Sequence, residues 1–497
     1  MRQTIKFFRF VDMERINPPR LVIAGLSGDS GKTLVSLGLI SYFANRGIDV
    51  SGFKKGPDYI DALWIASASG KPARNLDTFL MSRRVVYSSF IKHSRNEGLS
   101  IIEGNRGLYD GIGVDGVHST AELAKLLKAP IILVLNITKT TRTVAAIIKG
   151  CMDFDPEVNI AGVILNRVGG DRHKRVVAEA VAKYTNIPVV GAIPKIKSDT
   201  LIPGRHLGLI TPQEYPLIKQ AIDEAERIVR NYVNIDGLET ISRNTALMEA
   251  PKMEYKSEVT IGNGLRIGYF KDSAFTFYYP ENLELLGDNG AELIPISSMD
   301  DNSLPDIDAL YIGGGFPEMH SERIANNNSL MISVRKGAEC GLPIYAECGG
   351  LIYLSQALIS GSNQIPMAGV LPIKVKMFSK PKGHGYSRLL TDGENPYFQK
   401  GAELRGHEFH YTTVVEGNDK CTTIFKVEKG TGCFDGRDGI IKRNVLALYT
   451  HLHALGASGW MDGFIKAADR FHREKKRFGR DTIKKSKFEE KYKKMGV

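Results

Sequence analysis

The sequence predicts an α/β protein with two domains, and three observations support this. The chain has 497 residues, more than one hydrophobic core usually serves, so two domains of about 200 residues each are expected. Short continuous apolar runs alternate with segments of helical periodicity, which is typical of parallel strands covered by helices on both faces. A polar, weakly patterned stretch at residues 234–262 separates two such series.

The first series begins with "RLVIAGL" as a strand and "GKTLVSLGLISYFANRG" as a helix that ends at a glycine. Further strands are predicted for "LSIIEG", "PIILVLNI" and "IAGVILNRV", and the second series runs from "LRIGYF" through "LPIYAE" to "NVLALYTHLH". The sequence predicts, in chain order, an N-terminal extension at 1–19, a first domain at 20–233, a linker at 234–262, a second domain at 263–470 and a basic tail at 471–497.

The composition excludes several classes of protein. The hydrophobic content of 42% and charged content of 24% are those of a globular protein. The net charge of +11 comes largely from the tail, which mixes both signs and predicts a solvated appendage, so no nucleic-acid partner is expected. No apolar run approaches the roughly 20 residues of a membrane span, and the N-terminus lacks a secretory pattern. Five scattered cysteines indicate a reducing cytoplasm and no zinc site.

The segment "RLVIAGLSGDSGKT" predicts a phosphate-binding loop between a strand and a helix. Gly31 lets the backbone approach a phosphate, Lys32 is placed to reach the β- and γ-phosphates of ATP, and Thr33 to ligate Mg²⁺. A strict motif needs glycine where Leu26 stands, and Gly28 supplies a small residue nearby. The alternative, a plain strand–helix junction, is less favoured because acidic residues follow downstream.

Those acidic residues follow predicted strands. Asp58 and Asp61 lie in "FKKGPDYID", and Glu103 and Asp110 lie in "IIEGNRGLYDG". Carboxylates at the carboxyl ends of parallel strands face the crevice where a nucleotide binds. Asp58 and Glu103 are therefore expected to ligate Mg²⁺, and Asp58, Asp61 and Asp110 to support substrate binding and acyl transfer. Asn166, at another strand end, is a candidate for the adenine edge, although each residue taken alone is typical of a loop cap.

In "LPIYAECGGLIYL" a strand, a sharp glycine turn and a helix predict a nucleophile elbow at Cys348. Gly349 and the loop around Gly314, in "LYIGGGFPE", offer N–H groups for an oxyanion. His451, at the end of a late strand, is the predicted base. The other four cysteines are interpreted as small buried residues.

The segment "RGHEFHYT" contains His407, Glu408 and His410 without the spacing of a metal motif. The alternation in "EFHYTTV" predicts a strand. A structural or substrate-facing strand and an edge-strand histidine pair remain alternatives, so its role is unassigned.

Together, "KKGPDYID", "NLDTFLM", "IEGNRGLYDG", "RHLGLITP", "GGGFPE", "YAECGGLIYL", "GHEFHYT" and "LYTHLH" resemble the cobyrinate a,c-diamide synthase family, from about residue 20 to 465. The resemblance implies a dethiobiotin-synthetase-like P-loop domain followed by a flavodoxin-like class I glutamine amidotransferase domain. It also implies ATP, Mg²⁺ and glutamine, and amidation of the a and c acetates of a polycarboxylate tetrapyrrole through an acyl phosphate. Internal passage of ammonia between the sites is expected. The sequence does not determine the oligomeric state, and a homodimer is one alternative.

Two departures from the family pattern are visible. His453 stands where many class I amidotransferases carry a glutamate, so Cys348 and His451 are expected to act as a dyad, with a backbone carbonyl able to orient His451. The stretch "ALWIASASG" lies next to Asp61 and leaves the macrocycle open. Cobyrinate is the default, with nickel-sirohydrochlorin and siroheme as alternatives.

Two further hypotheses belong to other classes. A deviant Walker regulatory ATPase would carry a lysine where Ser27 stands and would lack the cysteine domain. A binding protein with a decayed amidotransferase module is disfavoured by the intact Cys348 and His451.

Overall fold

The computed structural model describes residues 10–196, 204–205, 208–253, 262, 264–457 and 459–480. The chain divides into two compact units, Met1–Lys256 and Ser257–Val497, and each is described by itself. No helix of the described residues is long and apolar enough to cross a membrane.

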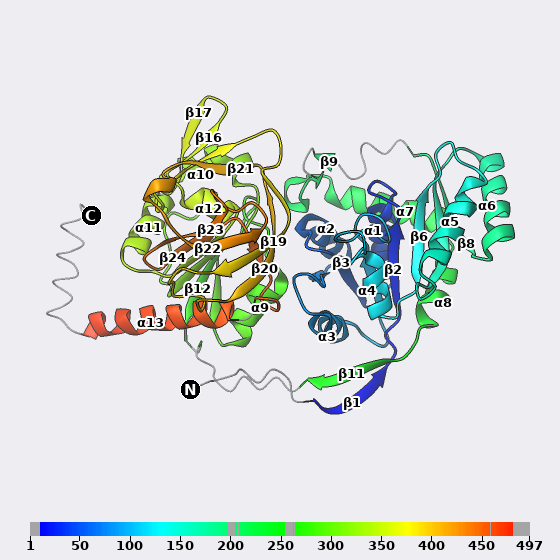
Figure 1. Ribbon diagram of the computed structural model, residues 1–497, viewed down its shortest axis with the longest axis horizontal. Helices are drawn as coiled ribbons and strands as arrows, with labels where there is room; N and C mark the ends of the chain where they lie inside the picture. Colours follow the sequence, from blue (N-terminus) through cyan, green and yellow to red (C-terminus); the bar gives the residue numbers. More distant parts are fainter. Residues whose placement is uncertain are drawn as a thin grey trace. The chain divides into compact units, whose positions relative to one another are not determined.

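The first unit is built on a seven-stranded sheet of parallel strands, in the order β4-β3-β5-β2-β6-β7-β8. Figure 1 labels β2, β3, β6 and β8 of this sheet together with helices of the same unit. The strands are β2 (Arg20–Gly25), β3 (Val50–Lys55), β4 (Arg74–Leu76), β5 (Leu99–Glu103), β6 (Ile131–Asn136), β7 (Ile160–Val168) and β8 (Val189–Pro194). Every residue of β2 and β5 is buried, which explains their continuous apolar pattern. Because β3, β5 and β2 are neighbours, their carboxyl ends bring three predicted site segments together.

Helices cover this sheet, and α1 packs against both α2 and α7, whereas α5 packs against α6. The helices are α1 (Lys32–Ala44), α2 (Tyr59–Ser69), α3 (Arg83–His93), α4 (Thr120–Leu126), α5 (Thr143–Phe154), α6 (Asp171–Thr185), η1 (Pro212–Glu214), α7 (Ile218–Tyr232) and α8 (Ile235–Arg243). A short pair, β9 (Gly204–Arg205) and β10 (Gly208–Leu209), overlaps "RHLGLITP", of which residues 206 and 207 are outside the described part.

The predicted linker differs from the structure. Residues 235–243 form α8, whose Leu238 is fully buried. Then β11 (Met248–Met253) pairs antiparallel with β1 (Phe10–Ile16), which lies in the predicted N-terminal extension. Both segments belong to the first unit. In α8, apolar residues at helical spacing are few, but they are sufficient to hold the helix against that unit. Residues 1–9 and most of 254–263 lie outside the described part.

The second unit contains a ten-stranded sheet in the order β13-β12-β14-β15-β24-β23-β22-β19-β20-β25. Strands β13 to β24 of this order are parallel, as predicted, and the others extend the sheet with antiparallel pairs. The strands are β12 (Arg266–Phe270), β13 (Glu292–Ile296), β14 (Ala309–Ile312), β15 (Ile344–Glu347), β19 (Gly383–Thr391), β20 (Glu403–His410), β22 (Thr422–Lys429), β23 (Arg437–Lys442), β24 (Val445–Leu448) and β25 (His451–Leu452).

A second sheet of four strands has the order β17-β16-β18-β21. It comprises β16 (Ala357–Ser360), β17 (Asn363–Pro366), β18 (Lys374–Met377) and β21 (Thr412–Glu416). The helices of this unit are α9 (Pro280–Asp288), η2 (Pro317–His320), α10 (Ser321–Asn326), α11 (Asn328–Glu339), α12 (Gly349–Leu354), η3 (Asn418–Lys420) and α13 (Trp460–Arg480).

The start of the basic tail is part of the second unit. Helix α13 continues through residue 480, ten residues past the predicted boundary. Lys475 pairs with Asp306 and Asp308 at 2.7 Å each, and Nδ1 of His472 lies 3.0 Å from Oδ1 of Asp308. These contacts hold the helix against the loop before β14, while residues 481–497 lie outside the described part.

Candidate functional sites

The phosphate loop links β2 to α1, and the Lys32 side chain folds back over the loop to contact backbone carbonyls. Gly31 has a φ of 102°, a left-handed conformation that favours glycine, and an added Cβ would lie 2.2 Å from Nδ2 of Asn166. Lys32 Nζ donates to the carbonyl oxygens of Ser27 at 2.7 Å and Arg106 at 2.9 Å. No carboxylate of the described residues pairs with this ammonium, and burial lowers its pKa. A buried cation that contacts only neutral acceptors is suited to bind a phosphate.

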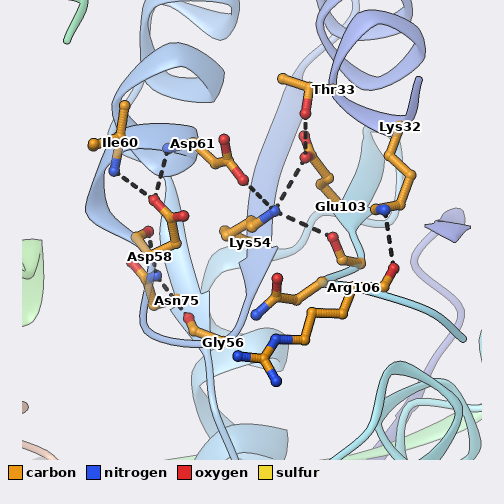
Figure 2. A network of polar contacts seen from close by, with 12 residues as sticks. Lys32, Thr33, Lys54, Gly56, Asp58, Ile60, Asp61, Asn75, Glu103 and Arg106 are labelled. Carbon is orange, nitrogen blue, oxygen red and sulfur yellow. Dashed lines mark hydrogen bonds and ion pairs between the residues drawn. The ribbon is translucent and has the colours of Figure 1, made fainter. Parts of the chain in front are cut away.

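Figure 2 shows a second cation, Lys54, in the middle of the predicted carboxylates. Its ammonium, at the end of β3, donates to Oε1 of Glu103 at 3.0 Å and pairs with Oδ2 of Asp61 at 2.5 Å. Burial opposes the charge of Lys54, but Asp61 and Glu103 outweigh it and hold the pKa of Lys54 above its ordinary value. Sequence reasoning missed this residue, although two lysines at a strand end before the Asp58 turn were a visible signal.

Thr33 and Glu103 fit the predicted magnesium site. The Thr33 hydroxyl donates to Oε1 of Glu103 at 2.8 Å beside the phosphate loop. Oε2 of Glu103 is buried and has no hydrogen-bond partner in the described part of the chain, so a divalent cation would satisfy it. One hydroxyl and one carboxylate, completed by phosphate oxygens and water, is a typical Mg²⁺ arrangement. No group of three or more His, Cys, Asp or Glu among the described residues is arranged to hold a metal ion.

Asp58 begins helix α2. Its Oδ1 accepts from the N–H of Ile60 at 2.7 Å and of Asp61 at 3.0 Å, which is the hydrogen bonding of an N-cap. Asn75 donates to the carbonyl oxygen of Asp58 at 2.9 Å. Burial and the charge of Asp61 raise the pKa of Asp58 to about 6. Asp58 therefore positions Asp61 against Lys54, and its role as a metal ligand stays a prediction.

Two other predicted residues support loops. Asp110 is exposed, and its Oδ2 accepts from the N–H of Gly107 at 2.9 Å. Asn166 donates through Nδ2 to the carbonyl oxygen of Ser30 at 2.8 Å and accepts through Oδ1 from the N–H of Arg167 at 2.9 Å. The amide predicted to bind adenine thus braces the phosphate loop. Acyl transfer by Asp110 and nucleotide recognition by Asn166 stay predictions.

The residue after Lys54 is a buried lysine with no counter-ion in contact. Lys55 is 5% exposed, and the described residues provide no ion pair or hydrogen bond to its ammonium. Burial lowers the pKa of Lys55, and the charge of Asp77 opposes this only in part. Consecutive strand residues point to opposite faces, so Lys55 faces away from the network around Lys54. An anionic group of a ligand would offset this buried charge.

The unusual stretch "ALWIASASG" forms part of α2 and serves the core. Trp64 and Ile65 are fully buried, and Nε1 of Trp64 donates to the carbonyl oxygen of Ile210 at 2.8 Å. The indole also packs on Tyr215, with 5.9 Å between ring centroids. The expectation that this stretch bears on the choice of macrocycle is not supported for Trp64, because its side chain fills the interior between α2 and η1.

In the second unit, Cys348 occupies the elbow between β15 and α12. Its φ of 46° is unusual for a residue with a side chain. The next two residues must be glycine, because a Cβ on Gly349 would lie 2.9 Å from Cδ of Pro317, and one on Gly350 would lie 2.6 Å from the carbonyl oxygen of Ile312. Burial raises the pKa of the Cys348 thiol, and the N–H of Gly349 opposes this by hydrogen bonding to the sulfur. The resting thiol is therefore protonated and needs a base.

The triple-glycine loop after β14 packs against this elbow. The N–H of Gly314 donates to the carbonyl oxygen of Phe277 at 3.3 Å, so this donor is already used. Gly314 is needed for a steric reason, since a Cβ there would lie 2.4 Å from Cε1 of His451. The backbone nitrogen of Gly315 lies 3.1 Å from the position of a Cβ on Gly349. Gly314 as an oxyanion donor stays a prediction, and Gly315 of the same loop is a second candidate.

His451 is buried and lies in β25, opposite His407 of β20. The two rings stack, with 5.0 Å between centroids and 25° between planes. Burial, and then the neighbouring His451, hold the pKa of His407 well below its ordinary value, so the stacked ring is neutral. Nδ1 of His451 lies 3.4 Å from Oε2 of Glu347. Sequence reasoning named His407 without a role and did not place it beside His451, and it missed Glu347 as a neighbour although Glu347 directly precedes Cys348.

The segment "GHEFH" forms β20, as the alternation predicts. Glu408 accepts from the N–H of Thr431 at 2.9 Å and of Gly432 at 3.0 Å. His410 stacks on Tyr449 at 3.8 Å between centroids. These residues brace the sheet around His451, and β20 is internal, with β19 on one side and β25 on the other.

The fold and the two sites define a nucleotide-dependent ligase domain joined to a class I glutamine amidotransferase domain. Residues 21–210 match the CobQ/CobB/MinD/ParA nucleotide binding domain, and residues 266–458 match the CobB/CobQ-like glutamine amidotransferase domain. The chain is 40% identical over 446 residues to cobyrinate a,c-diamide synthase of Magnetococcus marinus, which covers 89% of this chain and 95% of the relative. It is 40% identical over 451 residues to the protein of that name from Archaeoglobus fulgidus, with 90% and 97% covered. The chain belongs to the cobyrinate a,c-diamide synthase family.

Proposed function

We propose that this protein uses ATP and glutamine to convert the a and c acetate carboxylates of cobyrinate into amides. The observation that carries the proposal is the presence on one chain of a phosphate loop backed by Thr33 and Glu103 and of a cysteine elbow backed by His451. The name shared by relatives over about nine-tenths of the chain supports cobyrinate as the substrate. Nickel-sirohydrochlorin and siroheme are not favoured.

The ligase domain would activate the carboxylate. A carboxylate is a poor electrophile because its leaving group would be oxide, so its oxygen attacks the γ-phosphorus of ATP and ADP leaves, giving an acyl phosphate. Lys32 would hold the transferred phosphoryl group, and Thr33 with Glu103 would hold Mg²⁺, which neutralises phosphate charge when bound. Asp58, Asp61 and Asp110 are proposed to position the substrate, and Lys55 to bind one of its carboxylates.

The amidotransferase domain would supply ammonia. Cys348 attacks the amide carbon of glutamine while His451 accepts the thiol proton. The N–H groups of Gly349 and Gly315 stabilise the oxyanion. His451 then protonates the amide nitrogen, which leaves as ammonia, and water hydrolyses the thioester to glutamate and the free Cys348 thiol. Ammonia attacks the acyl phosphate, phosphate leaves, and the amide forms. Since the reaction needs ATP and a reduced thiol, we place it in the cytoplasm. The homodimer is a separate proposal, which sedimentation analysis would test.

The proposal is tested by measuring the mass of the macrocycle after the reaction. Purified protein is incubated with Mg-ATP, glutamine and cobyrinate, and in parallel with nickel-sirohydrochlorin or siroheme. We expect two successive amidations of cobyrinate and none without ATP. Amidation of another macrocycle in preference to cobyrinate would refute the substrate assignment, and no amidation of any macrocycle would refute the reaction.

A further inference from the structure

We propose that Glu347 is the positioning residue of the glutamine site, which orients His451 and makes a triad of the expected dyad. The acid would come from the residue directly before the nucleophile. In many class I amidotransferases it lies two residues after the histidine instead. The inference rests on the proposed function only for glutamine hydrolysis, and it does not depend on the identity of the macrocycle.

The two groups face each other in a dry environment. Oε2 of Glu347 lies 3.4 Å from Nδ1 of His451, and each side chain is 1% exposed. This separation exceeds the roughly 2.7–2.9 Å of a charge-assisted hydrogen bond, and such contacts shorten when substrate binds and charge develops. With Nδ1 turned toward Glu347, Nε2 is the ring nitrogen available to accept the thiol proton of Cys348.

Glu347 is held so that one oxygen is left for His451. Its Oε1 accepts from the hydroxyl of Tyr345 at 2.9 Å and from the N–H of Leu452 at 3.2 Å. Its Oε2 accepts from the hydroxyl of Tyr311 at 3.4 Å and also faces His451. No lysine or arginine of the described residues pairs with this carboxylate. Because a buried charge is costly without compensation, the imidazolium formed during the reaction is its counter-charge.

The residue that replaces the usual glutamate is turned to another carboxylate. Nε2 of His453 lies 3.6 Å from Oε2 of Glu281, and its ring packs on Tyr279 with 4.5 Å between centroids. His453 therefore does not take over the role of the missing acid. The sequence leaves open what orients His451, with a backbone carbonyl as one group that would serve, and the proposal assigns this role to a carboxylate.

The protons balance without transfer to Glu347. As the sulfur of Cys348 bonds to the amide carbon, the thiol proton moves to Nε2 of His451. The imidazolium keeps its Nδ1 proton directed at Glu347, which stays ionised and stabilises the positive ring. The Nε2 proton then passes to the amide nitrogen as the carbon–nitrogen bond breaks, and the nitrogen leaves as ammonia. Neutral His407, stacked on the ring, adds no competing positive charge.

The decisive variants are Glu347→Gln and Glu347→Asp in the full chain, assayed for release of glutamate from glutamine. For Glu347→Gln we expect kcat to fall roughly 10²- to 10⁴-fold, as when the acid of such a triad loses its charge. The KM for glutamine should stay within about threefold, because the carboxylate contacts the base and not the substrate. Glu347→Asp should recover part of the loss.

A spectroscopic signature and a matched control separate positioning from folding. In protein labelled with ¹⁵N-histidine, the strongly deshielded Nδ1 proton of His451 should disappear in Glu347→Gln. Asp308→Asn removes another buried carboxylate that faces a histidine, His472, in the same unit, and it should change neither glutamate release nor that proton signal. Ammonia-driven amidation reports the ligase domain separately.

Unchanged kcat in folded Glu347→Gln protein would overturn the proposal. So would an equal loss in Asp308→Asn, or retention of the deshielded proton without Glu347. Failure to amidate any macrocycle would refute the proposed ligase reaction yet leave this inference standing, because glutamate release is measured without a macrocycle.

Discussion

The two candidate sites differ in the charged groups that surround them. Around the phosphate loop, charges are abundant and one cation, Lys54, lies between Asp61 and Glu103. Around the thiol, the charged groups that act on it are the carboxylates of Glu318, Glu347 and Glu408, and Glu347 is the one that faces His451. A site for phosphates and carboxylates needs fixed positive charge, whereas a site for a neutral amide needs a proton acceptor. The protein therefore keeps each chemistry in its own unit.

The largest expected effect separates the two sites. Cys348→Ser should reduce glutamine-driven amidation roughly 10³-fold or more, because no comparable nucleophile remains, and should leave amidation with high ammonia intact. Product mass with each nitrogen source measures this. Loss of ammonia-driven activity in folded Cys348→Ser protein would contradict the division of labour.

The next effect removes phosphate binding. Lys32→Ala should reduce amidation with either nitrogen source roughly 10²- to 10³-fold, since one positioned cation at the transferred group is lost. Lys149→Ala, which removes an exposed lysine paired with Asp153 on α5, is the matched control and should be neutral. If ammonia rescued Lys32→Ala, the phosphate role would be wrong.

A third variant tests the buried ion pairs of the first unit. Lys54→Met leaves Asp61 and Glu103 without their shared counter-ion, which should destabilise this unit by roughly 3–5 kcal/mol. The chain has two tryptophans, Trp64 and Trp460, one in each unit, so a Trp460→Phe background makes fluorescence report the first unit during urea unfolding.

Its control is Lys71→Ala, which breaks an exposed pair with Asp49 and should cost no more than about 1 kcal/mol. Equal destabilisation by Lys54→Met and Lys71→Ala would show that the buried ion pairs of Lys54 do not stabilise the first unit more than an exposed pair does.

The smallest effect concerns the unusual helix α2. Trp64→Phe removes a buried hydrogen bond to Ile210 and should cost about 1–2 kcal/mol of stability. The KM for cobyrinate should stay within about threefold, because Trp64 lies in the core. Changed preference between cobyrinate and siroheme would instead place this stretch at the substrate.

The sequence predicts much of both sites because their signals are local. The phosphate loop and the cysteine elbow each depend on glycines within a few residues of the functional side chain, as at Gly31 and Gly349. Lys54 was less visible, because a lysine at a strand end becomes meaningful only when Glu103 from the adjacent strand is known to meet it. The oxyanion role predicted for Gly314 stays a prediction, and in the structure its N–H donates to the carbonyl oxygen of Phe277.

By itself, the sequence determined the two α/β series, the phosphate loop and the tight turn at the candidate nucleophile Cys348, because strand and helix periodicity and tight turns depend on neighbouring residues. The tertiary structure alone decided which groups face each other. Glu347 meets His451 and His407 stacks on it only through the register of β15, β20 and β25. Segments far apart along the chain become neighbours through sheet order and register, and these follow from packing the whole core and not from any local pattern.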